Sequence, residues 1–462
     1  MLKKIFNYFK INWHIAILII VVVCFFIGVS FFNYFTQKDD FVKWSSPDEA
    51  ANYTFAKLYS QEGQLAFFEK YNLIASGIIH PRSFRSDNGW LKPISFLGMP
   101  LIYGKIASLT SYKILPYLTP FFASLGIFFF YLFVKEIFGK REALISAMLL
   151  ASFPPFIYYS SRSMFHNVLF IVLLIISFYF VILAIKKLPP APTYQMGNKG
   201  AIKLKFLQDF FAGLAGFCLG LAIMVRASEL IWLIPIWLII WLFNFKKIGF
   251  IKLIIFIVCL LFSLLPMLCW NKILYQSYFS GGYNEMNQSI INITNLSSEI
   301  VQSGIKKTEI IKNNLIEIKN NFFYFGFSSH KSMKIFYFYF VHMFYWIFWP
   351  AVFGFLIFLR RIKKWESKHY VYLISYFVAT IILLFYYGSW NFYDNPDQQS
   401  KTIGNSYTRY WLWIYLGAMP FASIFLITLS EIFKKKNNNL QFSCFNNNYY
   451  IFYFHKICFI WQ

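Results

Sequence analysis

The sequence predicts an all-α polytopic membrane protein with about ten transmembrane helices. Of its 462 residues, 58% are hydrophobic and only 13% are charged, and the mean hydropathy is +0.52. Apolar runs recur along the whole chain at close to the ~20 residues that a helix needs to cross a bilayer. These runs are continuous rather than alternating, which excludes a transmembrane β-barrel.

Ten apolar segments are candidates for spans. They are residues 14–35, 113–134, 142–159, 167–185, 209–225, 229–245, 250–270, 335–359, 369–387 and 410–430. An eleventh segment, 94–109, is short and is interrupted by two glycines, a proline and a lysine.

The distribution of basic residues indicates the orientation. If 94–109 does not span, the basic connections lie on the same side as the N-terminal lysines. These connections are Lys135–Glu142, Lys186–Lys205, Asn244–Lys252, Arg360–Lys368 and Lys434–Lys436. The positive-inside rule places such connections in the cytoplasm. We therefore expect a cytoplasmic N-terminus that is an uncleaved signal anchor, and an interfacial or re-entrant helix at 94–109 in the first outer loop.

Residues 1–430 are expected to form one membrane-embedded domain. It would have a first outer loop at 37–113 and a third at 271–334, with a surface helix within the lysine-rich part of the third loop. Residues 431–462 are rich in Asn and aromatics towards their end and read as a cytoplasmic low-complexity tail. The net charge of +24 is clustered at segment ends, which argues against nucleic-acid binding. Six cysteines show neither metal-site nor disulfide spacing.

Two adjacent carboxylates, Asp48 and Glu49, follow the first apolar segment. Acidic residues are scarce, with 19 Asp and Glu against 43 Lys and Arg, so this pair is the clearest indication of chemistry. An alternative is purely structural, because Pro47 and Asp48 are also typical of a helix start.

Several cations are expected on the same outer side. Arg226 stands between two apolar runs with almost no loop, Lys92 lies in the first loop, and Arg409 precedes the last apolar segment. Guanidinium groups match phosphate geometry with two hydrogen bonds, although Arg226 could equally be an interfacial anchor. A carboxylate beside such cations predicts group transfer from a lipid-linked donor. The carboxylate would deprotonate the acceptor, and the cations would stabilise the leaving phosphate.

Six short stretches resemble motifs of one family, in the same order. They are Pro47-Asp48-Glu49-Ala50, Lys92-Pro93-Ile94-Ser95-Phe96, Phe138-Gly139-Lys140-Arg141-Glu142-Ala143, Phe153-Pro154-Pro155-Phe156 with Ser161-Arg162, Gly220-Leu221-Ala222 with Arg226, and Tyr407-Thr408-Arg409-Tyr410. The chain resembles the C-type glycosyltransferases, in the branch related to dolichyl-phosphate-mannose protein mannosyltransferases and bacterial aminoarabinose transferases. The resemblance covers roughly residues 10–235, with a weaker echo at 405–425.

The resemblance implies roles for individual residues. Asp48 would be the catalytic base with Glu49 as its partner, and Lys92, Arg226 and Arg409 would contact the donor phosphate. The donor would be a polyprenyl-phosphate sugar, and the acceptor a protein, lipid or glycan on the outer side of the bilayer.

The chain also departs from the family pattern. Ile94 replaces the second proline of the Lys-Pro-Pro-Leu stretch. The second outer loop, expected at Ser160–Asn167, lacks the acidic residue that many relatives place there. Arg162, His166 and Asn167 are therefore candidates to complete the site, although His166 could also be an ordinary interfacial histidine.

No cofactor is firmly implied. A divalent metal at Asp39 and Asp40 is possible, although a solvated acidic turn explains the same residues. No glycine-rich nucleotide loop is present, which fits a lipid-linked donor. A transporter or flippase of lipid-linked glycans is an alternative that would need more charges inside the spans. A glycan polymerase is another, and it would place arginines in the 271–334 loop, which has none.

Overall fold

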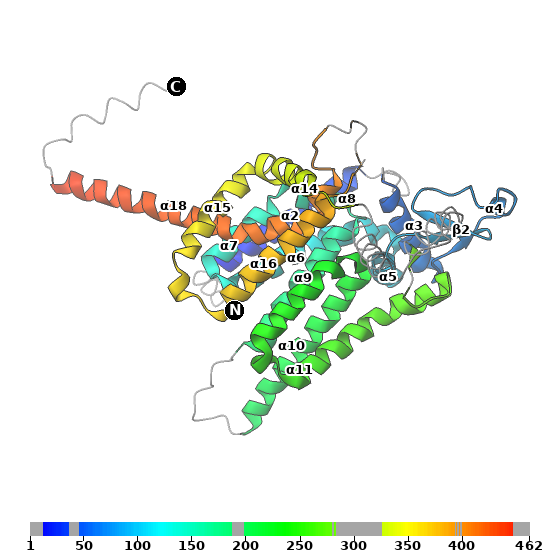
Figure 1. The fold of residues 1–462 in the computed structure, drawn as a ribbon, viewed down its shortest axis with the longest axis horizontal. Helices are drawn as coiled ribbons and strands as arrows, with labels where there is room; N and C mark the ends of the chain where they lie inside the picture. Colours follow the sequence, from blue (N-terminus) through cyan, green and yellow to red (C-terminus); the bar gives the residue numbers. More distant parts are fainter. Residues whose placement is uncertain are drawn as a thin grey trace, which may run out of the picture.

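A computed structural model describes residues 13–36, 46–186, 198–279, 281–282, 326–392, 394, 397 and 400–446, and only the backbone at 198–203 and 435–446. Within these ranges the chain forms helices and one small sheet, which confirms the all-α polytopic class. Figure 1 shows the long helices packed as a bundle. The first-loop elements α3, α4, α5 and β2 (blue) gather at one end, and α18 (red) projects away from the bundle.

The helices occur in the following order: α2 (Trp13–Thr36), α3 (Pro47–Glu62), α4 (Tyr71–Ile74), α5 (Gly98–Ser108), η2 (Tyr112–Ile114), α6 (Leu115–Ile137), α7 (Lys140–Ala151), α8 (Pro154–Arg162), α9 (His166–Ile185), α10 (Asn198–Val225), η3 (Ala227–Glu229), α11 (Leu230–Tyr275), α14 (Ser329–Phe336), η4 (Tyr337–His342), α15 (Tyr345–Leu359), η5 (Ile362–Lys364), α16 (Ser367–Gly388), α17 (Ser406–Tyr410) and α18 (Leu412–Asn446). Among the described residues, seven helices are long and apolar enough to cross a membrane, or up to nine if each of two bent pairs is one span. The expected number of ten remains a prediction. The surface helix expected in the third outer loop falls outside the described residues.

Helix α11 contains two of the predicted spans. Its backbone is not helical at Asn244 and Gly249, and Gly249 has a φ of 65°, which glycine adopts without steric cost. The chain folds back at this break. The contact between Trp237 before it and Phe256 after it, with ring centroids 5.0 Å apart, shows the reversal. The predicted separation between segments 229–245 and 250–270 therefore falls at the break.

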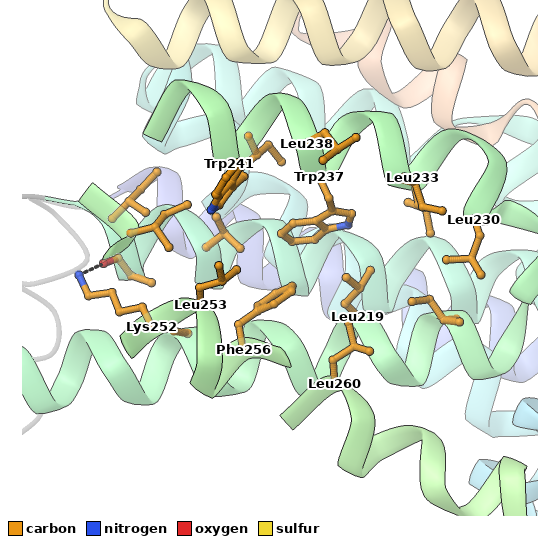
Figure 2. A pocket seen from close by; sticks show the side chains of 18 residues that line it. Leu219, Leu230, Leu233, Trp237, Leu238, Trp241, Lys252, Leu253, Phe256 and Leu260 are labelled. Atoms are coloured by element: carbon orange, nitrogen blue, oxygen red, sulfur yellow. Dashed lines mark hydrogen bonds between the residues drawn. The ribbon is translucent and has the colours of Figure 1, made fainter. Parts of the chain in front are cut away.

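The two halves of α11 run in opposite directions along the bundle. Just after the break, the Lys252 ammonium donates to the Ala184 carbonyl oxygen at 3.0 Å, at the C-terminal end of α9. At the far end, the Tyr275 hydroxyl donates to the Pro93 carbonyl oxygen in the first loop. Figure 2 shows the apolar pocket of about 480 Å³ between these halves, α9 and α10, with Lys252 at its mouth and Trp237 within it.

Two predicted spans are not straight helices. Residues 142–159 form α7 and α8, which meet at 55° because Pro154 has no N–H to continue the α7 hydrogen bonding. Residues 335–359 belong to a pair that begins at Ser329 and bends by 95°. There the Lys331 ammonium donates to the Ser389 carbonyl oxygen at 3.0 Å, which ties α14 to the end of α16.

Helix α18 crosses the predicted boundary between domain and tail at 430/431. Its helical backbone continues to Asn446, since no proline or glycine follows Pro420 in this stretch to end the helix. The remainder of the predicted tail, from 447 onwards, lies outside the described residues.

Helix α5 occupies the short apolar segment predicted not to span. Its 11 residues cover only ~16 Å, about half of a bilayer core. Most of it is buried against α3 and the end of α10. A Cβ added at Gly98 would lie 2.4 Å from the Met224 backbone, so glycine permits this close approach. The position of α5 at the membrane interface remains a prediction.

A three-stranded antiparallel sheet in the first loop was not expected. Its strands are β1 (Phe67–Phe68), β2 (Phe84–Asp87) and β3 (Trp90–Pro93), in the order β1-β3-β2. The turn between β2 and β3 is Asn88-Gly89, with φ values of 47° and 83°. Asn-Gly is the typical sequence of a two-residue hairpin turn, so the signal was present in the sequence.

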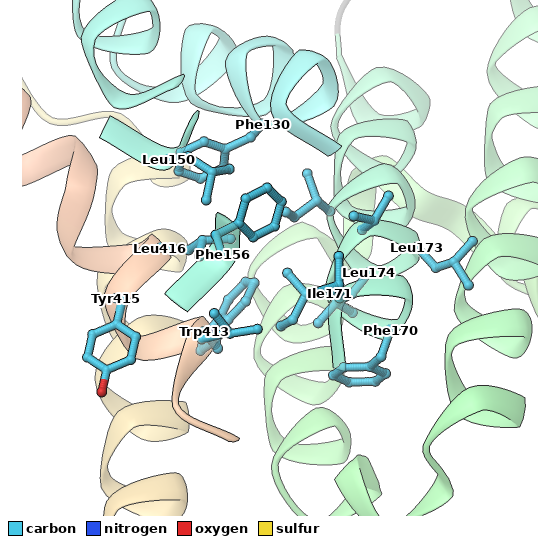
Figure 3. Close-up of a cluster of buried hydrophobic side chains, with 14 of the residues drawn as sticks. Phe130, Leu150, Phe156, Phe170, Ile171, Leu173, Leu174, Trp413, Tyr415 and Leu416 are labelled. Atoms are coloured by element: carbon cyan, nitrogen blue, oxygen red, sulfur yellow. The ribbon is translucent and has the colours of Figure 1, made fainter. Parts of the chain in front are cut away.

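Helix α9 is the central element of the main core. Figure 3 shows its Phe170, Ile171 and Leu174 among side chains from α6, α8 and α18. Almost every residue of its first three turns is buried, which is typical of a helix surrounded by others. The core therefore fixes the N-terminal end of α9, where His166 and Asn167 lie.

Candidate functional site

Asp48 lies in the first turn of α3 and is partly exposed. Helix α3 begins at Pro47 with Ser46 as its N-cap residue, so Asp48 is placed where a helix favours negative charge. Its Oδ1 accepts a hydrogen bond of 2.6 Å from the Ser83 hydroxyl, which precedes β2. Among the described residues Asp48 forms no ion pair, so its charge is available for chemistry.

Glu49 has the opposite environment, although it is the next residue. It is completely buried, and its carboxylate accepts two hydrogen bonds from Arg162, one of them from Nε at 2.9 Å. It also accepts the Ser46 backbone N–H, as in one half of a capping box. Burial raises the pKa of Glu49 above its ordinary value, and the Arg162 hydrogen bond opposes this effect. The structural interpretation of the acidic pair therefore suits Glu49 better than Asp48.

Arg162 links this pair to the second outer loop. Its Nη1 donates to the Tyr158 hydroxyl at 2.7 Å, and its guanidinium lies 5.2 Å from the Phe165 ring centroid. Because both carboxylate oxygens of Glu49 accept from Arg162, the loop is held against α3 by a bidentate ion pair.

His166 and Asn167 begin α9 on the same side. His166 Nδ1 lies 3.4 Å from the Asn52 Nδ2 amide of α3, and His166 Nε2 lies 3.2 Å from the Phe96 carbonyl oxygen. These contacts are satisfied together if Nε2 carries the proton and Nδ1 accepts. Asn52 also donates to the Met164 carbonyl oxygen at 2.8 Å. His166 therefore joins α3, the segment before α5 and the second outer loop.

Arg409 in α17 faces the same region. Its Nη2 donates to the Ser406 hydroxyl at 2.8 Å, and its guanidinium lies 4.4 Å from the Phe165 ring centroid. Its Nε is buried and has no hydrogen-bond partner among the described residues. Arg409 also forms no ion pair with any described carboxylate, although the charges of Asp48 and Glu49 both act on it. A half-buried guanidinium whose Nε–H has no partner among the described residues is a ready ligand for an anion.

Arg226 is more deeply buried than Arg409, and its charge is compensated. Its guanidinium pairs with Glu229 at 2.7 Å and donates to the Tyr387 hydroxyl at 3.2 Å. Glu229 in turn accepts from Tyr387 and from the Trp232 indole. The Tyr410 ring covers Arg226 at 4.7 Å and is stacked on Tyr387. This network joins η3 to α16 and α17.

Lys92 points away from the group around Asp48. Its ammonium donates to Asp87 at 2.6 Å and to the Leu274 carbonyl oxygen at 2.8 Å. The Lys92 hydrogen bond holds the pKa of Asp87 below its ordinary value. Lys92 therefore fastens the hairpin to the end of α11.

The fold brings together most of the candidate residues at one end of the bundle. Asp48, Glu49, Arg162, His166, Asn167, Arg226 and Arg409 are linked by the contacts above, by the Asn167 bond to the Arg409 carbonyl oxygen, and by the electrostatic effect of Asp48, Arg226 and Arg409 on His166. Lys92 lies in the same loop but is bound elsewhere. Sequence reasoning missed Ser83, Asn52, Phe165 and Tyr387, because neutral polar and aromatic residues in so aromatic a chain carry no distinctive signal. Tyr410 was included only as part of the motif around Arg409. Glu229 is visible in the sequence as the carboxylate three residues after Arg226.

The predicted metal residues Asp39 and Asp40 lie outside the described residues. Within the part of the chain that the structure describes, no three His, Cys, Asp or Glu side chains gather to hold a metal ion.

Comparisons with known proteins confirm the resemblance drawn from the sequence. Residues 109–195 match the family model described as dolichyl-phosphate-mannose-protein mannosyltransferase. This region runs from the end of α5 through α9, so it contains Arg162, His166 and Asn167. No curated protein sequence matches the chain.

Solved structures with a similar fold come from an archaeon. The crystal structure of the apo oligosaccharyltransferase of Archaeoglobus fulgidus has a TM-score of 0.50 and 14% identity, and the match covers 94% of this chain and 53% of that one. The archaeal oligosaccharyltransferase AglB from the same organism, in complex with an inhibitory peptide and a dolichol-phosphate, has a TM-score of 0.48 and 16% identity over 94% and 52%. The chain thus spans about half the length of these structures, and the likeness concerns the fold.

Proposed function

We propose that this chain is an inverting glycosyltransferase that transfers a sugar from a polyprenyl-phosphate donor to an acceptor. One observation carries the proposal. Among the described residues, Asp48 is a carboxylate without an ion pair, and Arg409 is a guanidinium with a buried Nε and no carboxylate partner. Both face one cluster at one end of an all-α membrane bundle. The first can take a proton and the second can hold a phosphate, which are the two needs of this reaction. The family match and the shared fold support the same class.

In the proposed reaction, Asp48 removes the proton from the acceptor hydroxyl or amine. The acceptor oxygen or nitrogen then attacks the anomeric carbon of the donor sugar. The bond between the anomeric carbon and the phosphate oxygen breaks, and the phosphate leaves with the lipid. Ser83 occupies one oxygen of Asp48 and orients the carboxylate so that the other faces the acceptor. A single displacement of this kind inverts the anomeric configuration.

Arg409 is the main phosphate ligand in this proposal. Arg226 and Lys92 stay candidates for donor contacts, but each is already bound to a carboxylate, so their contribution would be smaller. Glu49 would act by holding Arg162 and the second outer loop in place. His166 and Asn167 would line the site at the second outer loop, where many relatives have an acidic residue.

The proposed site faces the extracytoplasmic side of a cell membrane, with the N-terminus in the cytoplasm. The basic connections support this orientation, since they lie at the opposite ends of the helices. The acceptor would be a protein, a lipid or a glycan, and its identity would depend on residues around Asp48.

The test uses purified protein in lipid nanodiscs with radiolabelled polyprenyl-phosphate sugars. Wild-type protein should transfer or hydrolyse at least one of these donors, and Asp48→Asn should lower the rate about 10²- to 10⁴-fold, the usual contribution of a general base. Glu62→Gln is the matched control, because it removes an exposed carboxylate from the other end of α3. Full activity of Asp48→Asn would overturn the proposed base. Donor movement across the bilayer without cleavage would favour the transporter instead.

A further inference from the structure

A second cavity lies at the end of the bundle away from Asp48. It has a volume of about 520 Å³, within the ~300–1,000 Å³ range of ligand pockets, and lies between α6, α9, α11, α16 and α18. It reaches Lys186, just beyond the C-terminal end of α9, whereas the group around Asp48 contacts His166 at the N-terminal end. Along α9 the lining of the cavity begins at Phe178, ~18 Å from His166 for 12 residues of helix.

The walls of this cavity are mainly apolar, and its mouth is charged. Two ion pairs stand at the mouth, Lys186 with Glu136 at 2.7 Å and Lys368 with Glu366 at 3.2 Å. Lys247 also lines the mouth and has no carboxylate partner among the described residues. Among the described residues that line it, the mouth therefore has one positive charge in excess.

Two polar atoms in the wall of the cavity have no partner. Ser375 Oγ and Trp413 Nε1 are buried without a hydrogen bond among the described residues, and their residues are only 7% and 8% exposed. Both line the cavity. An unsatisfied polar group is costly where no water is available, so a ligand that offers oxygen atoms would bind favourably here.

We propose that this cavity binds one anionic phospholipid of the bilayer. The head-group phosphate would lie at Lys247, the ester oxygens would accept from Ser375 and Trp413, and an acyl chain would fill the apolar space between α9 and α16. The amphiphilic shape of the cavity and the charge at its mouth favour an anionic lipid over a zwitterionic one. A soluble anion alone would leave the apolar walls unfilled.

The site is connected by packing to the region of Arg226. The Trp413 ring lies 5.4 Å from that of Trp232, whose indole donates to Glu229. A lipid that binds Trp413 would therefore also stabilise the packing of Trp232, which is part of the Arg226 network. Binding should raise the midpoint of thermal unfolding, since it favours the folded state.

The experiment measures lipid binding to delipidated protein by native mass spectrometry. Phosphatidylglycerol and phosphatidylcholine with identical acyl chains serve as probes. One phosphatidylglycerol should bind with about five-fold preference, the effect of about one basic residue at a membrane surface. Lys247→Gln should remove the preference, and Lys246→Gln should keep it, because Lys246 is equally exposed but does not line the cavity.

A second variant tests the cavity itself. Ser375→Phe should fill the space and abolish the single tightly bound lipid of either kind, with the thermal midpoint no longer responding to phosphatidylglycerol. Equal binding of both lipids by the wild-type protein would overturn the proposal, as would equal losses in Lys246→Gln and Lys247→Gln. Neither outcome bears on the proposed transferase, because the assay contains no sugar donor.

Discussion

Arg226 and Arg409 contact the same aromatic ring and have opposite electrostatic environments. Tyr410 lies 4.7 Å from the Arg226 guanidinium and 5.2 Å from that of Arg409. Arg226 is compensated by Glu229. Among the described residues, Arg409 has only the Ser406 hydroxyl as a side-chain acceptor and keeps a buried Nε without a partner. Both were predicted as phosphate ligands. The difference favours Arg409 over Arg226 as the ligand of the proposed donor phosphate, because Arg226 is already compensated.

The physical reason is the cost of burying charge. A buried ion pair is stable only when each charge has its partner, and removal of one partner leaves the other uncompensated. We therefore expect Arg226 to contribute to folding, and Arg409 to contribute to the proposed donor binding. The variants below separate these two contributions.

The largest effect is expected for Glu229→Gln. This change leaves Arg226 buried without a compensating charge, and loss of one partner from a buried pair costs about 3–5 kcal/mol. The unfolding midpoint in denaturant, measured in detergent micelles, should fall accordingly. The double variant Arg226→Met with Glu229→Leu is the control, because it removes both charges and should recover most of the loss. If Glu229→Gln were as stable as wild type, Glu229 would not be needed to compensate the buried charge of Arg226.

Arg409→Gln should affect catalysis more than folding. Removal of one group that stabilises developing charge lowers the rate about 10²- to 10³-fold. No carboxylate among the described residues loses its partner, but the Ser406 hydrogen bond and the cation–π contacts with Phe165 and Tyr410 are lost. The unfolding free energy should therefore fall by about 1–2 kcal/mol, less than for Glu229→Gln. Donor turnover and thermal unfolding are measured on the same preparation. Arg409→Lys should recover only part of the rate, because an ammonium cannot make the two-pronged contact. A loss of stability without a loss of turnover would exchange the roles of the two arginines.

The sequence could predict most charged residues of this site and the side of the membrane on which they are expected. It could not predict which of their charges pair with one another. Apolar periodicity and charge placed Asp48, Arg226 and Arg409 on one side of a membrane bundle, because these signals are local in the chain. Which arginine is compensated depends on contacts between distant segments, such as Glu49 with Arg162 across 113 positions. Glu229 is the exception, since its spacing of three from Arg226 was visible. The bends at Pro154 and at Phe344 were also missed, since an apolar count does not register backbone breaks.

The smallest effect tests the ring that both arginines share. Tyr410 is stacked on Tyr387 with centroids 4.3 Å apart and planes inclined by 7°, so its ring has a fixed place between the two cations. Cation–π contacts contribute about 0.5–2 kcal/mol each. Tyr410→Leu should therefore lower the unfolding free energy by roughly 1–2 kcal/mol and reduce turnover about ten-fold. Tyr410→Phe keeps the ring and should behave almost as wild type in both measurements. Equal defects in the two variants would show that the Tyr410 hydroxyl, and not its ring, is responsible. The inference that the ring connects the two arginines would then be wrong.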